Sequence, residues 1–245
     1  ISKSLHKNKG TVIVKHANPC GVSINSNNVE SFRSALKCDP TSAFGGIVSC
    51  NFKINKNLAI ELNKIFLEVI IGNGFENDAL KILREKKNLR LIDSKNYVLK
   101  ENLKFISSNE EILIQSEDFK KFTIKDFKVV SKKKPSARQI KNLIFAFNIC
   151  RYVKSNAIVL TSNETTVGIG SGQPSRLDSC QIAVNKMKKF NLQNDNLVAA
   201  SDAFFPFVDG IEKLVQSGVR AVVQPFGSIR DKEIINFANE TNTVL

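Results

Sequence analysis

The segment of residues 47–71, IVSCNFKINKNLAIELNKIFLEVII, decides the fold class. Its first four residues are typical of a short strand, and residues 68–71 form a second apolar run of strand length. Between them Leu58, Leu62 and Ile65 recur at a spacing of three to four, which predicts an amphipathic helix over residues 55–66. A strand, a helix and a strand in succession indicate an α/β protein with a layered sheet.

The same alternation extends in both directions along the chain. A polar stretch over residues 116–134 ends in a lysine run before Pro135, and the alternation repeats beyond it. We therefore expect two subdomains, residues 1–131 and 132–245. The expected strands cover residues 11–14, 47–50, 68–71, 89–92, 127–130, 156–160, 197–200 and 221–223. The expected helices cover residues 28–37, 55–66, 78–86, 137–152, 176–189, 210–217 and 231–240, with loops or turns at 15–21, 39–46 and 166–172.

The composition is that of a globular chain and limits the partners. The chain has 245 residues, of which 42% are hydrophobic, and a net charge of +13. The lysines are scattered among Asn, Ile and Glu without a basic stripe interleaved with aromatic residues, so we expect no nucleic-acid partner. No apolar run approaches the roughly 20 residues of a membrane span, and the N-terminus lacks a secretory signal. We therefore expect no membrane partner. Since the sequence does not begin with Met, we also expect a fragment or a processed chain.

The cysteines and histidines argue against a metal centre. The five cysteines are odd in number and none has C-x-x-C spacing, so neither a disulfide framework nor a zinc site is expected. Only His6 and His16 are available, which excludes a multi-histidine metal site. This pattern favours a reducing, cytoplasmic location. The cysteines are Cys20, Cys38, Cys50, Cys150 and Cys180.

Lys15 and His16 stand where the first expected strand meets a Pro/Gly turn. Adjacent strand residues point to opposite faces, so both reach one site only where the pleat ends, which we place at Asn18-Pro19. An ammonium beside an imidazole disfavours imidazolium, and a neutral imidazole is what a general base needs. The alternative is a solvated lysine and a histidine bonded to a carbonyl group.

Two further segments have the composition of binding loops. Residues 168–172, GIGSG, precede a helix start that is able to hold an anion; a tight turn with positive φ is the alternative. The spacing does not match a dinucleotide fingerprint. Residues 204–207, FFPF, offer a rigid apolar wall for a planar heterocycle, or an ordinary lid over the core.

Six motifs stand in the order found in one family. Over nearly its whole length the chain resembles the AICAR transformylase part of the bifunctional purine-biosynthesis family. The motifs are residues 15–21 (KHANPCG), 39–48 (DPTSAFGGIV), 153–159 (VKSNAIV), 168–179 (GIGSGQPSRLDS), 201–207 (SDAFFPF) and 227–231 (GSIRD).

The resemblance implies a reaction. The 5-amino group of AICAR ribonucleotide takes the formyl group of 10-formyltetrahydrofolate, giving formyl-AICAR in the synthesis of IMP. By resemblance His16 removes the amine proton, and Lys15 stabilises the oxyanion or supplies a proton toward N10. Asn156 holds the formyl oxygen or the carboxamide. A wall of Phe204, Pro206 and Phe207 from a neighbouring copy faces them.

The resemblance also implies binding residues, an architecture and an assembly. The fold is two cytidine-deaminase-like three-layer α/β subdomains without zinc, since residues 19–20 lack the second cysteine of P-C-x-x-C and the H-x-E. The family is a homodimer with shared active sites. A potassium ion is known in some members, and Ser155 and Asp202 match part of its site. The implied substrate- and folate-binding residues are Glu68, Gly45, Arg176, Leu177 and Asp209, besides the aromatic wall.

The chain also departs from the family pattern. The cyclohydrolase part, a phosphate-binding arginine motif and the C-terminal tail are expected to be missing, so the resemblance predicts a chain truncated at both ends. Gly72-Asn73 replaces the Ala-Pro that is usual in the family, and Glu110-Glu111 replaces the usual Gly-Gly. We therefore expect weak nucleotide binding, and the alternative function is a catalytically inactive folate- or nucleotide-binding fragment.

Overall fold

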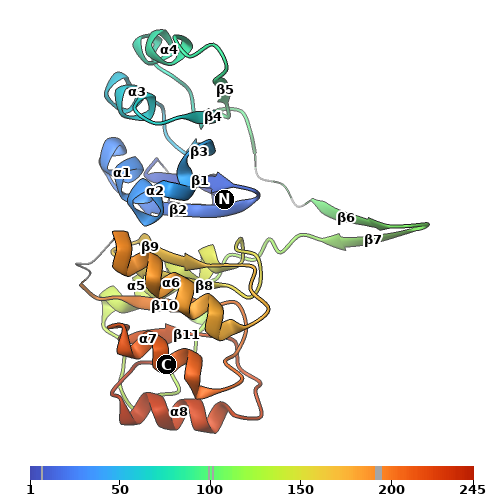
Figure 1. The fold of residues 1–245 in the computed structure, drawn as a ribbon, viewed down its shortest axis with the longest axis vertical. Coiled ribbons are helices and arrows are strands. Elements are labelled where there is room, and N and C mark those ends of the chain that lie inside the picture. The colour runs from blue at the N-terminus through green and yellow to red at the C-terminus, as the bar shows by residue number, and fades with distance from the viewer. Residues whose placement is uncertain (7, 99, 101, 191–194) are drawn as a thin grey trace.

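A computed structural model describes residues 1–6, 8–98, 100, 102–190 and 195–245. Within these residues the main feature is one nine-stranded mixed sheet with the strand order β11-β10-β8-β9-β2-β1-β3-β4-β5 (Figure 1). The α/β class expected from the sequence is confirmed. No described helix has the length and apolar character needed to cross a membrane.

The first half of the sheet is built from a hairpin and two parallel strands beyond it. β1 and β2 pair antiparallel, β1 pairs antiparallel with β3, and β3, β4 and β5 run parallel. The side chains of Asn27 and Asn55 cap α1 and α3 by accepting backbone N–H groups of the first helical turn. The elements are β1 (Gly10–Lys15), β2 (Asn18–Ile24), α1 (Asn28–Cys38), α2 (Pro40–Ala43), β3 (Gly46–Cys50), α3 (Lys56–Asn63), β4 (Leu67–Gly72), α4 (Asn77–Arg84) and β5 (Arg90–Asp93).

The second half repeats this arrangement. The hairpin β8–β9 corresponds to β1–β2, β10 pairs antiparallel with β8 as β3 does with β1, and β11 runs parallel to β10. Ser136 and Gln139 form a capping box at the start of α5. The repeat of architecture expected from the sequence is thus present in the fold. The elements are α5 (Ala137–Cys150), β8 (Ile158–Ser162), β9 (Thr165–Gly170), α6 (Arg176–Phe190), β10 (Val198–Ser201), α7 (Val208–Gln216), β11 (Ala221–Val223) and α8 (Asp231–Glu240).

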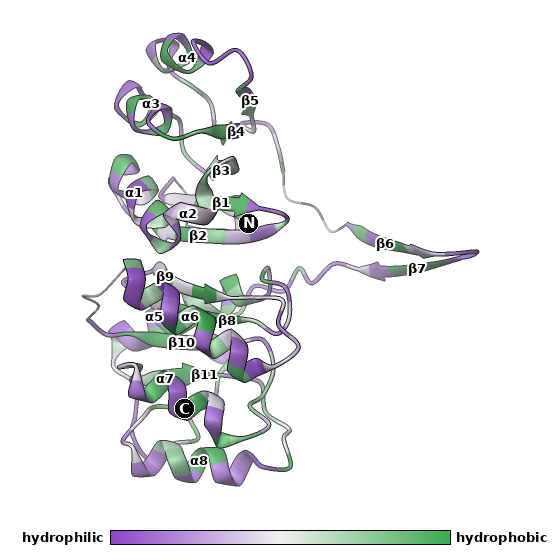
Figure 2. Ribbon diagram, viewed as in Figure 1, coloured by the Kyte–Doolittle hydropathy of each residue, from purple (hydrophilic) through white to green (hydrophobic). Residues whose placement is uncertain are grey.

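Hydrophobic side chains fill both faces of the second half of the sheet. Alternate strand residues face α6, α7 and α8 on one side and α5 on the other, which makes three layers. In the first half, α1, α3 and α4 cover one face. Figure 2 shows that hydrophobic residues concentrate on the strands and on the helix faces that turn toward them.

The two halves meet where β2 runs beside β9. Ser23 pairs with Thr165, and the Thr166 hydroxyl takes the place of a backbone partner by accepting the Val22 N–H at 2.8 Å. Above this seam the Lys186 ammonium lies 2.7 Å from the Asp39 carboxylate, which is almost completely buried. The halves therefore share one sheet, and the boundary between residues 131 and 132 stays a prediction.

Several local expectations were wrong. Residues 18–21 of the expected loop 15–21 belong to β2 (Asn18–Ile24), and residues 166–170 of the expected glycine loop 166–172 belong to β9 (Thr165–Gly170). The expected turn at 39–46 contains the short helix α2. Residues 127–130 lie outside the strands and run beside the chain end, where the Val130 N–H donates to the Leu245 carbonyl at 2.9 Å. The structure also contains the 3-10 turns η1 (Ser2–Ser4) and η2 (Ile124–Asp126) and a separate hairpin of β6 (Leu103–Ser108) and β7 (Glu111–Ser116).

Candidate functional site

Lys15 and His16 lie at the tip of the β1–β2 hairpin. Lys15 pairs with Asn18, so His16 and Ala17 alone form the turn, with φ of 51° and 60°. Two positive φ values are typical of the tight turns that suit hairpin twist. The pleat therefore ends at His16, not at Asn18-Pro19 as the sequence suggested. His16 is exposed and Lys15 is half-buried.

The turn geometry belongs to the fold and does not by itself mark a site. The β8–β9 hairpin has the same two-residue turn, with φ of 53° at Asn163 and 54° at Glu164. What distinguishes the first hairpin is the pair of residue types at its tip, an ammonium next to an imidazole.

The Lys15 ammonium is anchored beside the predicted binding residue Gly45. Lys15 Nζ donates to the Phe44 carbonyl at 2.6 Å, and the Gly45 N–H donates to the Phe66 carbonyl at 2.9 Å. The rings of Phe44 and Phe66 lie 5.2 Å apart, and both are about half exposed. Gly45 has a φ of +70°, which a residue with a Cβ adopts only with strain. The predicted residue Glu68 is exposed on β4, two positions after Phe66.

Asn156 lies in the loop before β8, and its side-chain amide is fully bonded within the chain. Its Nδ2 group donates to the carbonyls of Gln173 at 2.7 Å and Pro174 at 2.9 Å. Its Oδ1 accepts from Arg176 Nη2 at 2.6 Å. The backbone carbonyl of Asn156 accepts from the Ser179 hydroxyl at 2.8 Å. In this arrangement the amide holds the 173–174 loop in place; its role toward a formyl group stays a prediction.

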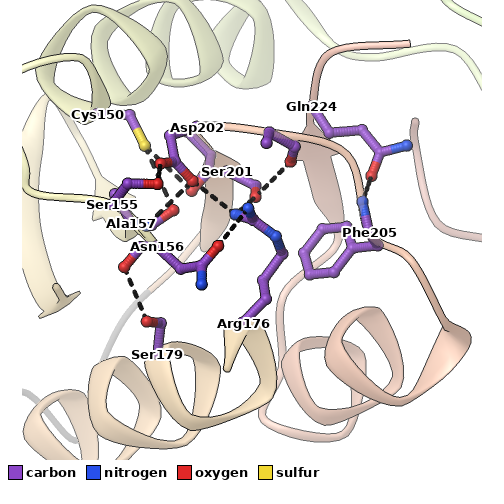
Figure 3. Close-up of polar contacts among 12 residues, drawn as sticks. Cys150, Ser155, Asn156, Ala157, Arg176, Ser179, Ser201, Asp202, Phe205 and Gln224 are labelled. Atoms are coloured by element: carbon purple, nitrogen blue, oxygen red, sulfur yellow. Dashed lines mark hydrogen bonds and ion pairs between the residues drawn. The ribbon is translucent and has the colours of Figure 1, made fainter. Parts of the chain in front are cut away.

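Arg176 is the centre of a polar cluster at one end of the second-half sheet (Figure 3). Its Nη1 donates to Asp202 at 2.6 Å and to the Ser201 hydroxyl at 2.7 Å. The Arg176 and Asp202 side chains are 9% and 17% exposed, so this is a largely buried ion pair. The guanidinium therefore connects β10, the loop before β8 and its own helix α6.

Asp202 is held ionised by its neighbours. Burial alone opposes its charge, but the Ser155 hydroxyl, the Arg176 guanidinium and the Ala157 N–H all donate to it. Together they lower the pKa of the Asp202 carboxyl below its ordinary value. Figure 3 shows these donors converging on the carboxylate.

This arrangement does not fit a potassium ion between Ser155 and Asp202. A cation there needs free oxygen ligands, whereas both carboxylate oxygens of Asp202 accept from protein donors, one of them a guanidinium. The expectation of potassium remains untested, and we assign the ion no role. Among the described residues no group of three or more His, Cys, Asp or Glu is arranged to hold a metal ion.

The aromatic loop after β10 alternates between core and surface. Phe205 is buried, while Phe204, Pro206 and Phe207 are exposed on the same loop. The Phe205 N–H donates to the Gln224 side chain at 2.9 Å, which anchors the loop (Figure 3). The Arg230 guanidinium lies 4.8 Å from the centre of the Phe207 ring. Phe204, Pro206 and Phe207 are therefore exposed together on one loop, and their role as a wall for a heterocycle stays a prediction.

The two remaining predicted binding residues lie on helices. Leu177 is partly exposed in the first turn of α6, next to Arg176. Asp209 is exposed at the start of α7, where its carboxylate accepts the Gly210 N–H at 2.6 Å. The binding roles of Leu177 and Asp209 stay predictions.

Two glycines of residues 168–172, Gly168 and Gly170, lie where α6 packs closely on β9. A Cβ on Gly170 would lie 1.9 Å from the Ser179 carbonyl, so its absence lets α6 pack directly on β9. Gly172 alone has a positive φ, and its N–H donates to the Lys154 carbonyl at 2.8 Å. The positive φ of Gly172 agrees with the turn alternative, and the anion site stays a prediction.

Asn18 connects the hairpin tip to the second-half loops, whereas the sequence predicted only that the strand pleat ends at this residue. Its Oδ1 accepts the Lys154 N–H at 2.9 Å, and its Nδ2 donates to the His16 carbonyl at 3.3 Å. Lys154 is two residues before Asn156, so the hairpin tip and the Asn156 loop lie side by side. The only signal for Asn18 was its place in the KHANPCG motif.

Two cavities lie away from Lys15 and His16. One of about 650 Å³ lies between α5, residues 122–130 and the β11 edge. The other, of about 570 Å³, lies beside η1 and β5. The sequence-based account needs a closed pocket at Lys15 and His16; in the single chain His16 is exposed instead.

The comparisons with known proteins agree with the motif order. A family model described as the AICARFT/IMPCHase bienzyme matches residues 2–186. A bifunctional purine biosynthesis protein PurH of Persephonella marina is 45% identical over 231 residues, which are 94% of this chain and 44% of that protein. The PurH proteins of Chlorobium phaeobacteroides and Leptospira biflexa are 42% and 41% identical over 94% and 99% of this chain. The chain spans a little less than half the length of these relatives. This chain belongs to the AICARFT/IMPCHase bienzyme family.

Proposed function

We propose that this chain acts in purine biosynthesis by transferring a formyl group from 10-formyltetrahydrofolate to the 5-amino group of AICAR ribonucleotide. Family membership and the printed names of the relatives, bifunctional purine biosynthesis proteins, support the pathway. The observation that carries the reaction is the placement of Lys15 and His16 at an exposed hairpin tip that Asn18 ties to the Asn156 loop.

The chemistry requires orientation and proton transfer. The lone pair of the amine is delocalised into the imidazole and carboxamide, so the amine is a poor nucleophile. As its nitrogen bonds to the formyl carbon, it must lose a proton, and the bond from that carbon to N10 must break while N10 gains a proton. A positioned acid and base contribute about 10²–10⁴ in rate to such a step.

His16 and Lys15 supply these two functions. The imidazole of His16 takes the amine proton, and its exposure leaves it accessible to a bound substrate. The Lys15 ammonium uses one N–H on the Phe44 carbonyl and has two left to stabilise the oxyanion or to protonate N10. The Phe44 contact keeps the charge at the hairpin tip.

The polar cluster supports the site without contacting the reacting atoms in this arrangement. Arg176 is engaged by Asn156, Ser201 and Asp202, and we assign it the task of fixing the Asn156 loop. The exposed faces of Phe204, Pro206 and Phe207 supply the wall for the heterocycle, and Leu177, Gly45, Glu68 and Asp209 complete the proposed binding residues.

The proposal includes a homodimer with shared sites in the cytoplasm. His16 is exposed in the single chain, so a closed site needs a surface from elsewhere, and the aromatic loop of a second copy is the proposed one. The cysteines of the chain are all free, which suits a reducing compartment.

A second candidate is a folate- or nucleotide-binding module without catalysis. One observation favours it: the Asn156 amide and the Arg176 guanidinium are both used by bonds within the chain. Such a module binds a folate analogue but transfers no formyl group.

The test is to incubate the 245-residue chain with both substrates at high concentration and to follow formyl-AICAR and tetrahydrofolate. We expect slow transfer with a high KM, in a one-to-one ratio of products. Binding of a folate analogue without transfer would favour the non-catalytic module. If the chain neither bound the folate analogue nor transferred the formyl group, both candidates would be refuted.

A further inference from the structure

Phe66 stands at the edge of the sheet where Lys15 also lies. β3 lies between β1 and β4, antiparallel to β1 and parallel to β4, so the end of β1 meets the starts of β3 and β4 at this edge (Figure 1). Lys15 is the last residue of β1, and Phe66 directly precedes β4. The steps proposed above use Lys15 and leave Phe66 without a role.

An irregularity in β4 keeps Phe66 out of the core. The register between β3 and β4 shifts after the Gly46–Leu67 pair, which leaves Glu68 as an extra residue in β4. Leu67 and Ile70 therefore both pack in the core, although residues three apart point to opposite faces of a regular strand. In a regular strand Phe66 would share the buried face of Ile70. Its side chain is instead 48% exposed.

A single peptide group, between Phe44 and Gly45, connects Phe66 to Lys15. Phe44 has φ of −59° and ψ of 125°, and Gly45 has φ of 70°, which are values of the central residues of a type II turn. The C=O and the N–H of a trans peptide point in opposite directions. Here the C=O accepts from Lys15 Nζ at 2.6 Å, and the N–H donates to the Phe66 carbonyl at 2.9 Å. The peptide is thus held by Lys15 on one side and by Phe66 on the other.

The aromatic rings hold the same turn. The rings of Phe44 and Phe66 are tilted by 45° with their centres 5.2 Å apart. A Cβ on Gly45 would lie 3.5 Å from the Phe66 ring and 3.9 Å from Lys15 Nζ, so the ring and the ammonium border the same small space. Phe66 therefore restrains Phe44 through its ring and Gly45 through its carbonyl.

We propose that Phe66 is a positioning residue, which fixes the Phe44–Gly45 peptide and through it the Lys15 ammonium. This rests on the proposed function, in which Lys15 stabilises the oxyanion or protonates N10. A lysine has a flexible four-carbon stem, and its charge assists a reaction most when it is held in place beforehand. Phe66 supplies this restraint and touches no reacting atom.

The kinetic test compares Phe66→Ala with Phe66→Tyr and with Ile60→Ala, which removes an exposed apolar side chain from α3. We expect Phe66→Ala to lower kcat roughly 10–100-fold with little change in KM, because the ammonium is misplaced but not lost. Phe66→Tyr keeps the ring and should restore most of the rate, and Ile60→Ala should match the parent. A raised KM with an unchanged kcat would make Phe66 a substrate-binding residue and overturn the proposal.

A double-mutant cycle tests whether Phe66 acts through Lys15. In a Lys15→Met background, Phe66→Ala should change kcat by less than about twofold, since the ammonium that it positions is gone. If Phe66→Ala lowered kcat by the same factor with and without Lys15, the two residues would act independently and the proposal would be wrong.

Hydrogen exchange of the Gly45 amide tests the link without catalysis. Phe66→Ala and Lys15→Met should each accelerate this exchange at least about threefold, because each frees one side of the peptide group, and Ile60→Ala should leave it unchanged. If both variants accelerated it while the parent chain transferred no formyl group, the proposed function would fail and the link from Phe66 to Lys15 would stand. Unchanged exchange in Phe66→Ala would overturn the proposal.

Discussion

The Oδ1 atom of Asn18 accepts the backbone N–H of Lys154 at 2.9 Å, across 136 positions of sequence. This bond joins the hairpin tip of the first half to the loop of the second half that carries Asn156. The Nδ2 group of the same side chain donates to the His16 carbonyl. One amide thus holds the proposed base and the proposed amide residue in a single arrangement.

Substitutions of Asn18 should separate its two bonds. Asn18→Ala loses both, and we expect about 1 kcal/mol of stability and several-fold in kcat to be lost with it. Asn18→Asp keeps an acceptor for the Lys154 N–H and loses only the donor to the His16 carbonyl. It should therefore retain most of the stability and most of the kcat. Urea unfolding and formyl-transfer kinetics measure the two effects. Equal losses in the two variants would mean that the Lys154 bond does not position the loop.

The Arg176–Asp202 pair should contribute strongly to stability. Breaking a buried pair costs about 3–5 kcal/mol, and we expect about 2–3 here because Asp202 keeps two other donors and some exposure. Arg176→Met should show this loss in urea unfolding. Arg176→Lys should recover part of it, since one ammonium cannot span Asn156, Ser201 and Asp202 as the planar guanidinium does.

Arg33→Met is the matched control for that measurement. Arg33 pairs with Glu30 and Glu61 on the surface, so its removal should change the unfolding midpoint little. If Arg176→Met lowered the unfolding midpoint as little as Arg33→Met, the polar cluster would not be a structural element of the site.

The contact between the halves should depend on pH. Burial disfavours the Asp39 carboxylate, but bonds from Lys186 and Ser42 outweigh it, so the pKa of Asp39 lies below its ordinary value. The folded state therefore binds this proton less readily than the unfolded state, and the contribution is complete above about pH 4 and lost as the pH falls below it. Lys186→Met should cost about 1–2 kcal/mol at pH 7, allowing for the partial exposure of Lys186, and clearly less at pH 3.

The control for this experiment is Lys188→Met on the same helix. Lys188 is exposed, so its substitution should leave unfolding by urea unchanged at both pH values. An equal loss in Lys186→Met at pH 7 and pH 3 would show that the ion pair with Asp39 is not the source of the stability.

Close packing of α6 on β9 should make Gly170 intolerant of substitution. The Cβ of Gly170→Ala would lie 1.9 Å from a backbone carbonyl, so the helix must move away. We expect a loss at or above the upper end of the roughly 1–3 kcal/mol seen for overpacking. In Gly218→Ala nothing lies near the new Cβ, and only the positive φ disfavours the substitution. We expect this variant to lose about 1 kcal/mol of stability. Similar unfolding midpoints for the two variants would contradict the packing argument.

Most helices and strands follow from sequence periodicity, and the exceptions have physical causes. The expected bounds of α8, residues 231–240, agree with the structure because its apolar spacing is regular. β2 was missed because Asn18, Pro19 and Gly21 are individually typical of turns. Pro19 is accommodated at an irregularity in the register, and Gly21 by the close approach of α1.

The candidate site residues follow from the order of the motifs, whereas the bonds that these residues make do not. Motif order pointed to Lys15, His16, Asn156 and Arg176, but which groups they contact depends on loops brought together from both halves. The bonds of Asn156 to Arg176 and to the 173–174 carbonyls span about 20 positions, and no periodicity encodes them. The link through Asn18 is more distant still.

The central claim is that the imidazole of His16 removes the amine proton in formyl transfer. The most direct test is the kcat of His16→Asn, because asparagine tolerates the φ of 51° at this turn and cannot accept a proton at neutral pH. We predict a fall in kcat of about 10²–10⁴ with a KM and a stability close to those of the parent chain. An unchanged kcat with a raised KM would make His16 a binding residue and contradict the account.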